Sequence, residues 1–248
     1  MKVKLFNIEI DALSMRQTLD LVEDAVANDK HIHHTVVNAG KIVLMQEDKE
    51  LEKSVNEADL INADGQAVVW ASKMLGSPLP ERVSGIDLME KLVKRSFEKG
   101  YRCYFLGAEE DVVSNLITLY KKKYSNNVIA GYRNGYFKKS DEKSIAKVIS
   151  QSNANILFVA ITSPKKEIFL NTYKKELKNI NFIMGVGGSF DVIAGKVNRA
   201  PKWMQDIGFE WLYRVIQEPR RMFMRYLVGN TKFIYLVLKE FFLLNRKV

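Results

Sequence analysis

Short apolar runs and longer amphipathic stretches take turns along the first 195 residues of the chain. Runs such as 101–106 and 156–161 are mostly apolar and are bounded by glycine or polar residues, which is typical of buried strands. Stretches such as 85–99 repeat apolar residues every three or four positions, which predicts helices with one buried face. This alternation predicts an α/β fold with a mostly parallel sheet flanked by helices.

The same patterns place each element. After an opening strand and a helix that Ser14 can cap, strands are expected at 33–38, 60–62, 101–106, 128–130, 156–161 and 182–186. Helices are expected over 41–56 with an interruption near Asp48, over 66–75 and 85–99, from Gly107-Ala108 to about 124, and over 140–150 and 164–177. The opening residues lack the continuous apolar core of a signal peptide, so a cytoplasmic location is expected.

Polar residues and glycines gather where the predicted strands end. These positions are Asn38, Asp64-Gly65, Gly107-Ala108, Thr162-Ser163 and Gly187-Gly188-Ser189. Ligands of open α/β sheets bind outside the carboxyl ends of the strands, where helix N-termini offer free N–H groups to a diphosphate. We therefore expect one crevice here, although tight backbone packing is an alternative reason for the glycines.

Asp64 is the carboxylate that stands out. It follows a short apolar strand and precedes a glycine, so its side chain can point into the crevice. A carboxylate there can act as a general base that takes a proton from an attacking hydroxyl. An aspartate before a helix also commonly caps that helix, and the spacing alone does not separate the two roles.

Positive charge is concentrated at the C-terminal end. Residues 196–248 contain 11 Lys and Arg against 4 Asp and Glu, a balance of +7, whereas the whole chain contains 38 against 29, a balance of +9. The preceding 195 residues are therefore almost neutral. We interpret 1–195 as an α/β catalytic core and 196–248 as a basic amphipathic C-terminal appendage.

The appendage combines cations with apolar residues at roughly helical spacing, namely Phe223, Leu227, Ile234, Val237, Leu238, Phe241 and Leu244. No apolar run approaches the ~20 residues that a bilayer-spanning helix needs. The pattern favours a helix that lies in a membrane interface with anionic lipid. The alternative is a helix packed on its own domain or on a sister subunit in a homo-oligomer. Nucleic acid is not expected as a partner, because no standard binding motif is present.

Arginines in two places suit phosphate recognition. Arg214, Arg221 and Arg225 recur at helical spacing, and Arg82 precedes the Ser84-Gly85 turn. Guanidinium groups match phosphate oxygens with two parallel hydrogen bonds, so we favour phosphate binding over a solvated surface.

Metal and cofactor signals are weak. The chain has neither a DxD triplet nor a GxGxxG fingerprint, and His31-x-His33-His34 has no neighbouring carboxylate. We interpret the histidines as a solvated strand edge and predict no metal and no cofactor. The single cysteine, Cys103, excludes an intramolecular disulfide and is expected to be buried.

Several longer motifs carry a resemblance to a known family. They are Asn38-Ala39, Ala63-Asp64-Gly65, Leu79-Pro-Glu-Arg82-Val-Ser-Gly85, Phe105-Leu-Gly107, Ser163-Pro-Lys-Lys-Glu167, Gly185-Val-Gly-Gly-Ser-Phe-Asp191, Ala194-Gly-Lys-Val-Asn-Arg199-Ala-Pro201, Glu210-Trp-Leu-Tyr-Arg214 and Glu218-Pro-Arg-Arg221. With them the chain resembles, from end to end, the TagA/WecG/CpsF glycosyltransferases of bacterial cell-surface polysaccharide synthesis.

The resemblance implies a Rossmann-like catalytic fold of the GT-E type and an inverting, metal-independent transfer of a sugar from a UDP-sugar. The sugar would be N-acetylmannosamine, and the acceptor N-acetylglucosamine on a polyprenyl diphosphate at the inner face of the cytoplasmic membrane, in teichoic acid or surface polysaccharide synthesis. Asp64 would be the general base, and the arginine-rich appendage would close over the active site at the membrane and contact the donor diphosphate. The implied binding residues are Thr35, Asn38, Gly65, Arg82, Ser84, Gly85, Gly107, Ala108, Lys166, Glu167, Gly187, Gly188, Asp191, Arg214, Arg221 and Arg225.

Two departures from the family pattern concern the identity of the sugar. Val36 stands where a threonine is typical, with Thr35 beside it, and Lys166 replaces the glutamine of the common Pro-Lys-Gln-Glu. Lys166 would suit the carboxylate of a uronic acid sugar, so another UDP-sugar, such as glucose or a uronic acid sugar in capsule or exopolysaccharide synthesis, is one alternative. A nicotinamide-dependent enzyme and a membrane-surface binding protein without catalysis are more distant ones.

Overall fold

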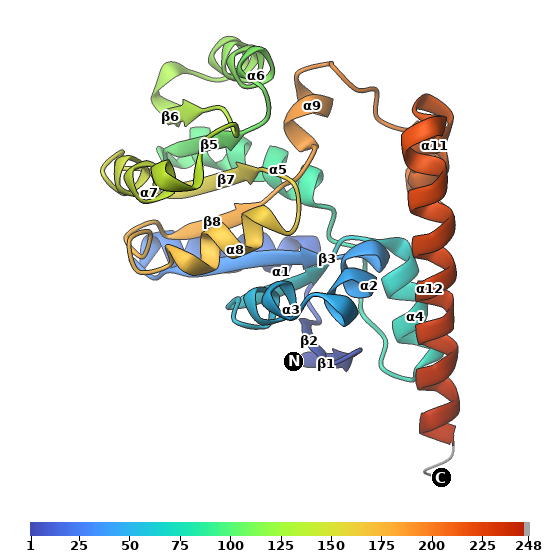
Figure 1. Cartoon of the computed structure of the whole chain (residues 1–248). Coiled ribbons are helices and arrows are strands. Elements are labelled where there is room, and N and C mark those ends of the chain that lie inside the picture. Colours follow the sequence, from blue (N-terminus) through green and yellow to red (C-terminus); the bar gives the residue numbers. More distant parts are fainter. Residues whose placement is uncertain (246–248) are drawn as a thin grey trace.

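The computed structural model describes residues 1–245 and contains a six-stranded parallel sheet of order β4-β3-β8-β7-β5-β6. The strands are β3 (Ile32–Val37), β4 (Leu60–Ala63), β5 (Cys103–Gly107), β6 (Ile129–Arg133), β7 (Ile156–Ala160) and β8 (Phe182–Gly185). Their carboxyl ends point towards the C-terminal helices α11 and α12 (Figure 1). The α/β fold with a helix-flanked parallel sheet is thus confirmed.

Helices cover both faces of this sheet because successive side chains of each strand point to opposite sides. Cys103 and Phe105 pack with α1 (Met15–Ala27), α5 (Gly85–Lys99) and α6 (Glu110–Lys123). Tyr104 and Leu106 pack on the other side with α7 (Glu142–Ser150) and α8 (Lys165–Thr172). Helix α8 ends five residues earlier than the pattern predicted, and turns follow it. The short 3₁₀ helix η1 (Asn126–Val128) precedes β6, and a second one, η2 (Lys139–Asp141), precedes α7.

A third cluster of buried residues lies beside the β4 edge. It contains the antiparallel hairpin β1 (Lys2–Leu5) and β2 (Ile8–Asp11), with α2 (Ala39–Glu47), α3 (Lys49–Asn56) and α4 (Gln66–Met74). The opening segment is thus a separate hairpin, joined to β4 where the Ile61 N–H donates to the Asp11 carboxylate at 2.9 Å. The predicted interruption near Asp48 is confirmed, since Asp48 ends α2 and accepts a hydrogen bond from the Leu51 N–H as the cap of α3.

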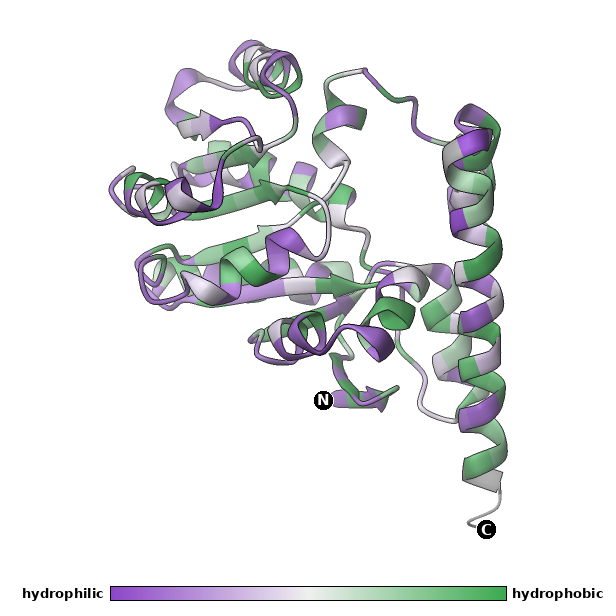
Figure 2. Cartoon of the chain, in the orientation of Figure 1, coloured by the Kyte–Doolittle hydropathy of each residue, from purple (hydrophilic) through white to green (hydrophobic). Residues whose placement is uncertain are grey.

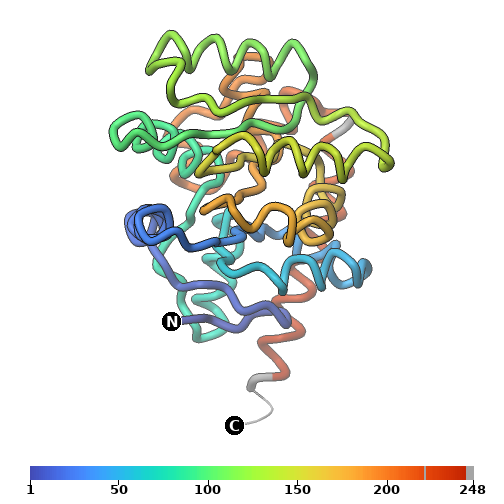
Figure 3. Tube along the Cα trace, turned by 90° about the vertical axis from the view of Figure 1, so that its left-hand side faces the viewer, coloured from blue at the N-terminus to red at the C-terminus, as the bar shows by residue number. Residues whose placement is uncertain are grey.

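The C-terminal segment contains α10 (Lys202–Asp206), α11 (Glu210–Gln217) and the long helix α12 (Pro219–Asn245), after the short α9 (Ser189–Ile193). Helix α12 runs beside the core and extends beyond its lower end (Figures 1 and 3). Phe233 and Val237 are buried in the same cluster as α2 and α4, and Lys232 pairs with Glu47 of α2 at 2.6 Å. The predicted C-terminal helix is present, and it packs on the core.

Some residues of the predicted apolar stripe of α12 pack against the core, and others are exposed to solvent. Val237 is buried and Phe241 is partly buried against the core, whereas Phe223, Leu227, Ile234 and Leu238 are exposed; Leu244 lies outside the described side chains. Hydrophobic and hydrophilic residues alternate along the whole of α12, in contrast to the mostly hydrophobic strands (Figure 2). Within residues 1–245, no helix has both the length and the hydropathy needed to cross a bilayer.

Candidate active site

Asp64 lies at the carboxyl end of β4 and is half-buried. Its backbone N–H donates to the Val37 carbonyl at 2.8 Å, which extends the β3–β4 ladder by one residue. Its carboxylate accepts a hydrogen bond from the backbone N–H of Gly85, the first residue of α5. The cap position of α4 belongs to Gly65, so Asp64 contacts the N-terminus of α5 and does not cap the helix that follows it.

The surroundings of Asp64 shift its acidity towards neutrality. Burial, helped by the Glu210 carboxylate, raises the pKa of Asp64 to about 6, although Arg82, the Gly85 N–H and Arg214 oppose the rise. A base is most effective when its pKa is close to the working pH, because it is then deprotonated and still attracts a proton strongly. A pKa of about 6 is therefore one that would suit a general base.

Arg82 reaches this site from the loop before α5. The loop follows the end of β4, because the Val83 N–H donates to the Ala63 carbonyl at 2.9 Å. Arg82 Nη1 lies 3.3 Å from Glu210 Oε2 of α11, and Arg214 Nη2 lies 3.6 Å from Glu210 Oε1. The structure thus brings two predicted arginines together beside Asp64, one from the core and one from the C-terminal segment.

A second contact ties the C-terminal segment to the start of α5. Arg199 donates to both carboxylate oxygens of Asp87 at 2.6 and 2.8 Å. Ser84, one of the predicted binding residues, is buried and hydrogen-bonds the same carboxylate. Ser84 therefore helps to hold this ion pair, two residues after Arg82.

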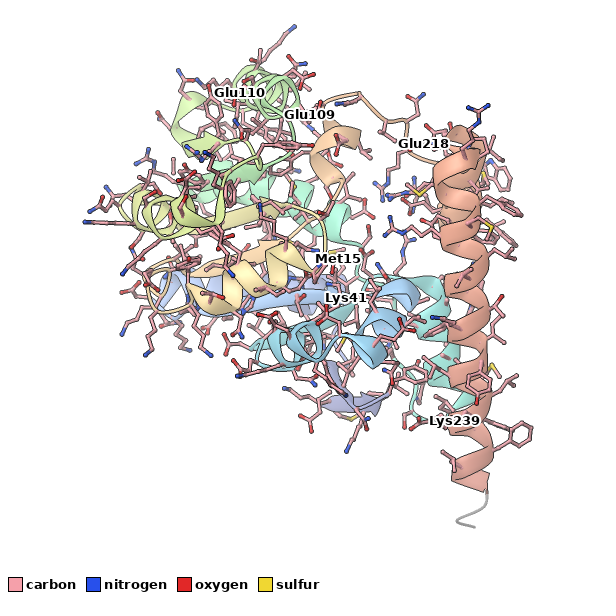
Figure 4. The ribbon with its side chains drawn as sticks, viewed as in Figure 1. Met15, Lys41, Glu109, Glu110, Glu218 and Lys239 are labelled. Atoms are coloured by element: carbon pink, nitrogen blue, oxygen red, sulfur yellow. The ribbon has the colours of Figure 1, made fainter. Side chains whose placement is uncertain are left out.

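A buried charge cluster lies at the ends of β3 and β8. Lys41 Nζ and Lys166 Nζ are both 2.7 Å from Glu167 Oε1, and all three side chains are buried. Lys41 also contacts the Val36 carbonyl at 2.5 Å and Thr35 Oγ1 at 3.3 Å. Figure 4 shows Lys41 at the end of the sheet that faces α12. Two ammonium groups share one carboxylate here, which leaves a buried excess of positive charge.

These partners change the acidities within the cluster. Burial, helped by the Lys41 ammonium, lowers the pKa of Lys166 to about 8, although Glu167 and Asp64 oppose the change. Burial alone would raise the pKa of Glu167, but Lys41 and Lys166 outweigh it and hold this pKa at about 2. The Lys166 ammonium has an internal carboxylate partner, so the structure does not favour its pairing with a donor carboxylate.

The site also contains three predicted residues with clear local roles. Asn38 caps α2, accepting a hydrogen bond from the Lys41 N–H at 3.0 Å. Gly65 packs against it, and a Cβ at position 65 would lie 3.3 Å from the Asn38 Cβ. Close approach of the two helix starts explains both residues, and Thr35, buried inside β3, supports Lys41.

Gly107 and Ala108 lie away from Asp64. Three strands separate β5 from β4, which corresponds to about 19 Å at the usual strand spacing. Gly107 has φ +137°, and a Cβ there would lie 2.4 Å from the Ala160 carbonyl oxygen, so packing against β7 requires glycine. The turn after β8 holds Gly187 at φ +53°, followed by Gly188 and Asp191 at the start of α9. Phosphate binding at both turns stays a prediction.

The remaining predicted arginines belong to α12. Arg225 is exposed on this helix. Arg221 also belongs to α12, but its side chain lies outside the described residues. Of the three arginines in the predicted ladder, Arg214 is the one with a described contact to the Asp64 site, through Glu210.

The histidine interpretation is wrong for two of the three residues. β3 lies inside the sheet, so His33 and His34 are buried, and burial lowers their pKa values to about 4 and about 3. His34 Nε2 lies 3.0 Å from Asn62 Oδ1. In the described part of the chain, no group of three or more His, Cys, Asp or Glu side chains could hold a metal ion. Cys103 is buried as predicted.

Lys41 and Glu210 were not among the residues assigned to the site from the sequence. A lysine in an amphipathic helix is usually solvated, but Lys41 shares a helix face with Met45, four residues on, which is buried. That spacing was the one sequence feature that could have indicated that Lys41 is buried. Glu210 belongs to the quoted motif before Arg214, but only the fold shows that it meets Arg82.

If Lys166 assists the reaction in its charged form, activity should fall above about pH 8, because a lysine with a lowered pKa loses its proton there. Lys166→Gln should remove this alkaline limb of the pH–rate profile. Lys165→Gln, at the exposed neighbouring position, should keep it. An unchanged alkaline limb in Lys166→Gln would exclude titration of Lys166 as its cause.

Comparison with known proteins identifies the family of the chain. A family model described as the Glycosyl transferase WecG/TagA/CpsF family matches residues 3–247. The chain is 35% identical over 189 residues to the N-acetylglucosaminyldiphosphoundecaprenol N-acetyl-beta-D-mannosaminyltransferase of Bacillus spizizenii (strain ATCC 23059 / NRRL B-14472 / W23), covering 76% of this chain and 72% of that protein. It is 34% identical over 193 residues to the protein of the same name from Bacillus subtilis (strain 168), covering 78% and 73%. The resemblance is confirmed: the chain belongs to the WecG/TagA/CpsF family and is a glycosyltransferase.

Proposed function

We propose that this glycosyltransferase moves N-acetylmannosamine from a UDP-sugar to N-acetylglucosamine carried on a polyprenyl diphosphate. The observation that carries the proposal is the half-buried Asp64 with a raised pKa, placed next to Arg82 and Arg214 in a chain of this family. The names of the two Bacillus relatives support this choice of sugar and acceptor.

The proposed reaction is a single displacement that inverts the configuration at the anomeric carbon of the donor sugar. Asp64 takes the proton of the acceptor hydroxyl while the hydroxyl oxygen forms a bond to the anomeric carbon of the donor sugar. The bond from that carbon to the diphosphate oxygen breaks, and its electron pair leaves with UDP. Arg82 and Arg214 stabilise the charge that develops on the departing diphosphate, the role that a metal ion has in other enzymes.

The proposed site of action is the inner face of the cytoplasmic membrane, where the enzyme binds peripherally. On α12, Arg225, Lys232 and Lys239 recur every seven residues and therefore lie in one row along the helix. Exposed Phe223, Leu227, Ile234 and Leu238 lie on nearly the opposite side of the helix from this row, and exposed Met224, Val228, Tyr235 and Phe242 lie on the outer face between them. A basic row beside exposed apolar side chains fits anionic lipid, and a lipid-linked acceptor requires the active site to reach the bilayer.

Purified protein, UDP-N-acetylmannosamine and a short-chain polyprenyl-diphosphate-linked N-acetylglucosamine should release UDP in the presence of EDTA. A requirement for added Mg²⁺ or Mn²⁺ would contradict metal-independent transfer. A panel of UDP-sugars in thermal melts tests the donor separately, since a ligand at 100 times its Kd stabilises by about 2.7 kcal/mol. Transfer or stabilisation only with UDP-glucose or a UDP-uronic acid would contradict the proposed sugar.

A further inference from the structure

Glu210 forms ion pairs with both arginines of the candidate site, Arg82 and Arg214. Its Oε2 lies 3.3 Å from Arg82 Nη1, and its Oε1 lies 3.6 Å from Arg214 Nη2. The Arg82 and Glu210 side chains are only 15% and 19% exposed. One carboxylate thus contacts, through its two oxygens, guanidinium groups from two distant parts of the chain.

The backbone fixes Glu210 in this place. Gly208 has φ +77°, and a Cβ there would lie 2.9 Å from the Cβ of Gln66, the first residue of α4. The Phe209 N–H donates to the Met204 carbonyl at 2.8 Å, which closes the turn before α11. Only a glycine allows this turn to approach the start of α4, two residues after Asp64. The first residue of α11 is therefore held next to the base.

The charges show what this carboxylate does for the arginines. Two guanidinium groups held together repel each other, and a carboxylate between them offsets that repulsion. Each guanidinium has five N–H donors, so its contact with Glu210 leaves others available for phosphate oxygens. Arg82, Glu210 and Arg214 together retain one positive charge, which suits a diphosphate.

The same carboxylate acts on Asp64. The charged side chains that face Asp64 are Arg82 from the loop before α5, Glu210 and Arg214 from α11, and Lys166 from α8. Burial is the largest cause of the raised pKa of Asp64. Among the charged side chains, Glu210 raises this pKa, while Arg82 and Arg214 lower it. Removing the Glu210 charge leaves the two arginines unopposed, so the pKa of Asp64 should fall.

We infer that Glu210 is a positioning residue that aligns Arg82 and Arg214 to bind the donor diphosphate next to Asp64. This inference rests on the proposed function, because the diphosphate is that of the proposed UDP-sugar. Glu210 acts through the arginines and does not itself contact the reacting atoms.

Glu210→Gln in the full-length protein is the test, with Asp206→Asn as the matched control. Asp206 belongs to α10 and pairs with Lys202 on the exposed surface, so its replacement removes the same charge four residues away. In calorimetry with UDP, Glu210→Gln should bind about tenfold more weakly or worse, because misaligned binding groups lose much of their effect. The acid limb of its pH–rate profile should move to lower pH, and Asp206→Asn should resemble the wild type in both measurements.

A double-mutant cycle that combines Glu210→Gln with Arg82→Lys tests whether Glu210 acts through Arg82. The loss of UDP affinity caused by Glu210→Gln should be much smaller in the Arg82→Lys background than in the wild type. Equal losses of UDP affinity in both backgrounds would overturn the positioning role. So would a Glu210→Gln variant that has a lowered melting temperature and an unchanged acid limb in its pH–rate profile. If the wild type binds UDP and Glu210→Gln binds it equally well, the inference fails alone. If the wild type binds no UDP, the proposed donor fails and the inference fails with it.

Discussion

Replacing Asp64 with asparagine is expected to reduce turnover by about 10²–10⁴-fold, the usual contribution of a general base. An amide cannot accept the proton of the acceptor hydroxyl, whereas Arg82 and Arg214 remain in place to bind the donor. UDP release at saturating donor should therefore collapse, while the affinity for UDP changes little. In the wild type, turnover should fall as the pH drops below about 6, because Asp64 becomes protonated there.

The stability of this variant separates catalysis from a structural role. The folded state raises the pKa of Asp64 above its ordinary value, so the folded protein binds this proton more tightly than the unfolded chain does. The charged carboxylate therefore disfavours folding above about pH 6, and stability from this group rises as the pH falls through that value. Asparagine carries no charge and can still accept the Gly85 N–H, so the melting temperature at neutral pH should stay equal or rise.

Asp48→Asn provides the matched control, because Asp48 is a helix cap in which asparagine serves equally well. It should retain both turnover and stability. If Asp64→Asn kept more than about a third of wild-type turnover with a normal melting profile, Asp64 would not be the general base. A clear loss of stability in Asp64→Asn would instead indicate that the carboxylate matters mainly for holding the N-terminus of α5.

The fold could be predicted closely because each of its signals is local. Short apolar runs such as 156–161, bounded by polar residues, are typical of buried strands, and Asp48 is a residue type that ends one helix and caps the next. The hairpin at residues 2–11 was less accessible. Its alternation matches any half-buried strand, and only contacts with α2 and α4 place it outside the main sheet.

The site was predictable in its location but not in its pairings. The rule that ligands bind at the carboxyl ends of strands led to Asp64 without any contact information. The Lys41–Glu167 pair and the Arg82–Glu210 pair join residues 126 and 128 positions apart, and no local pattern encodes such a pair. Glycine at 107 looked like a phosphate turn, although a 2.4 Å approach to the neighbouring strand is sufficient reason for it.

Exposed apolar side chains of α12, such as Phe223 and Leu227, are expected to hold the protein on the membrane. Phe223→Ser and Leu227→Ser together should abolish sedimentation with anionic liposomes and reduce transfer to acceptor embedded in them about 100-fold. Both side chains are exposed, so their replacement should leave the fold intact. Residues 196–248 are better probed by such substitutions than by deletion, because Phe233 and Val237 belong to the core and their loss would expose it.

A water-soluble acceptor separates anchoring from chemistry in this experiment. The double variant should transfer sugar to that acceptor at the wild-type rate, since Arg82, Glu210 and Arg214 are untouched. The matched control is Leu119→Ser with Val148→Ser, two exposed apolar residues of α6 and α7 on the other side of the molecule from α12, which should sediment as the wild type does (Figure 1). Unchanged liposome binding by the α12 variant would refute anchoring through this face. If the wild type is dimeric in solution and the α12 variant is monomeric but still binds liposomes, the face serves self-association instead, because exposed apolar side chains of this kind also mark contacts between subunits.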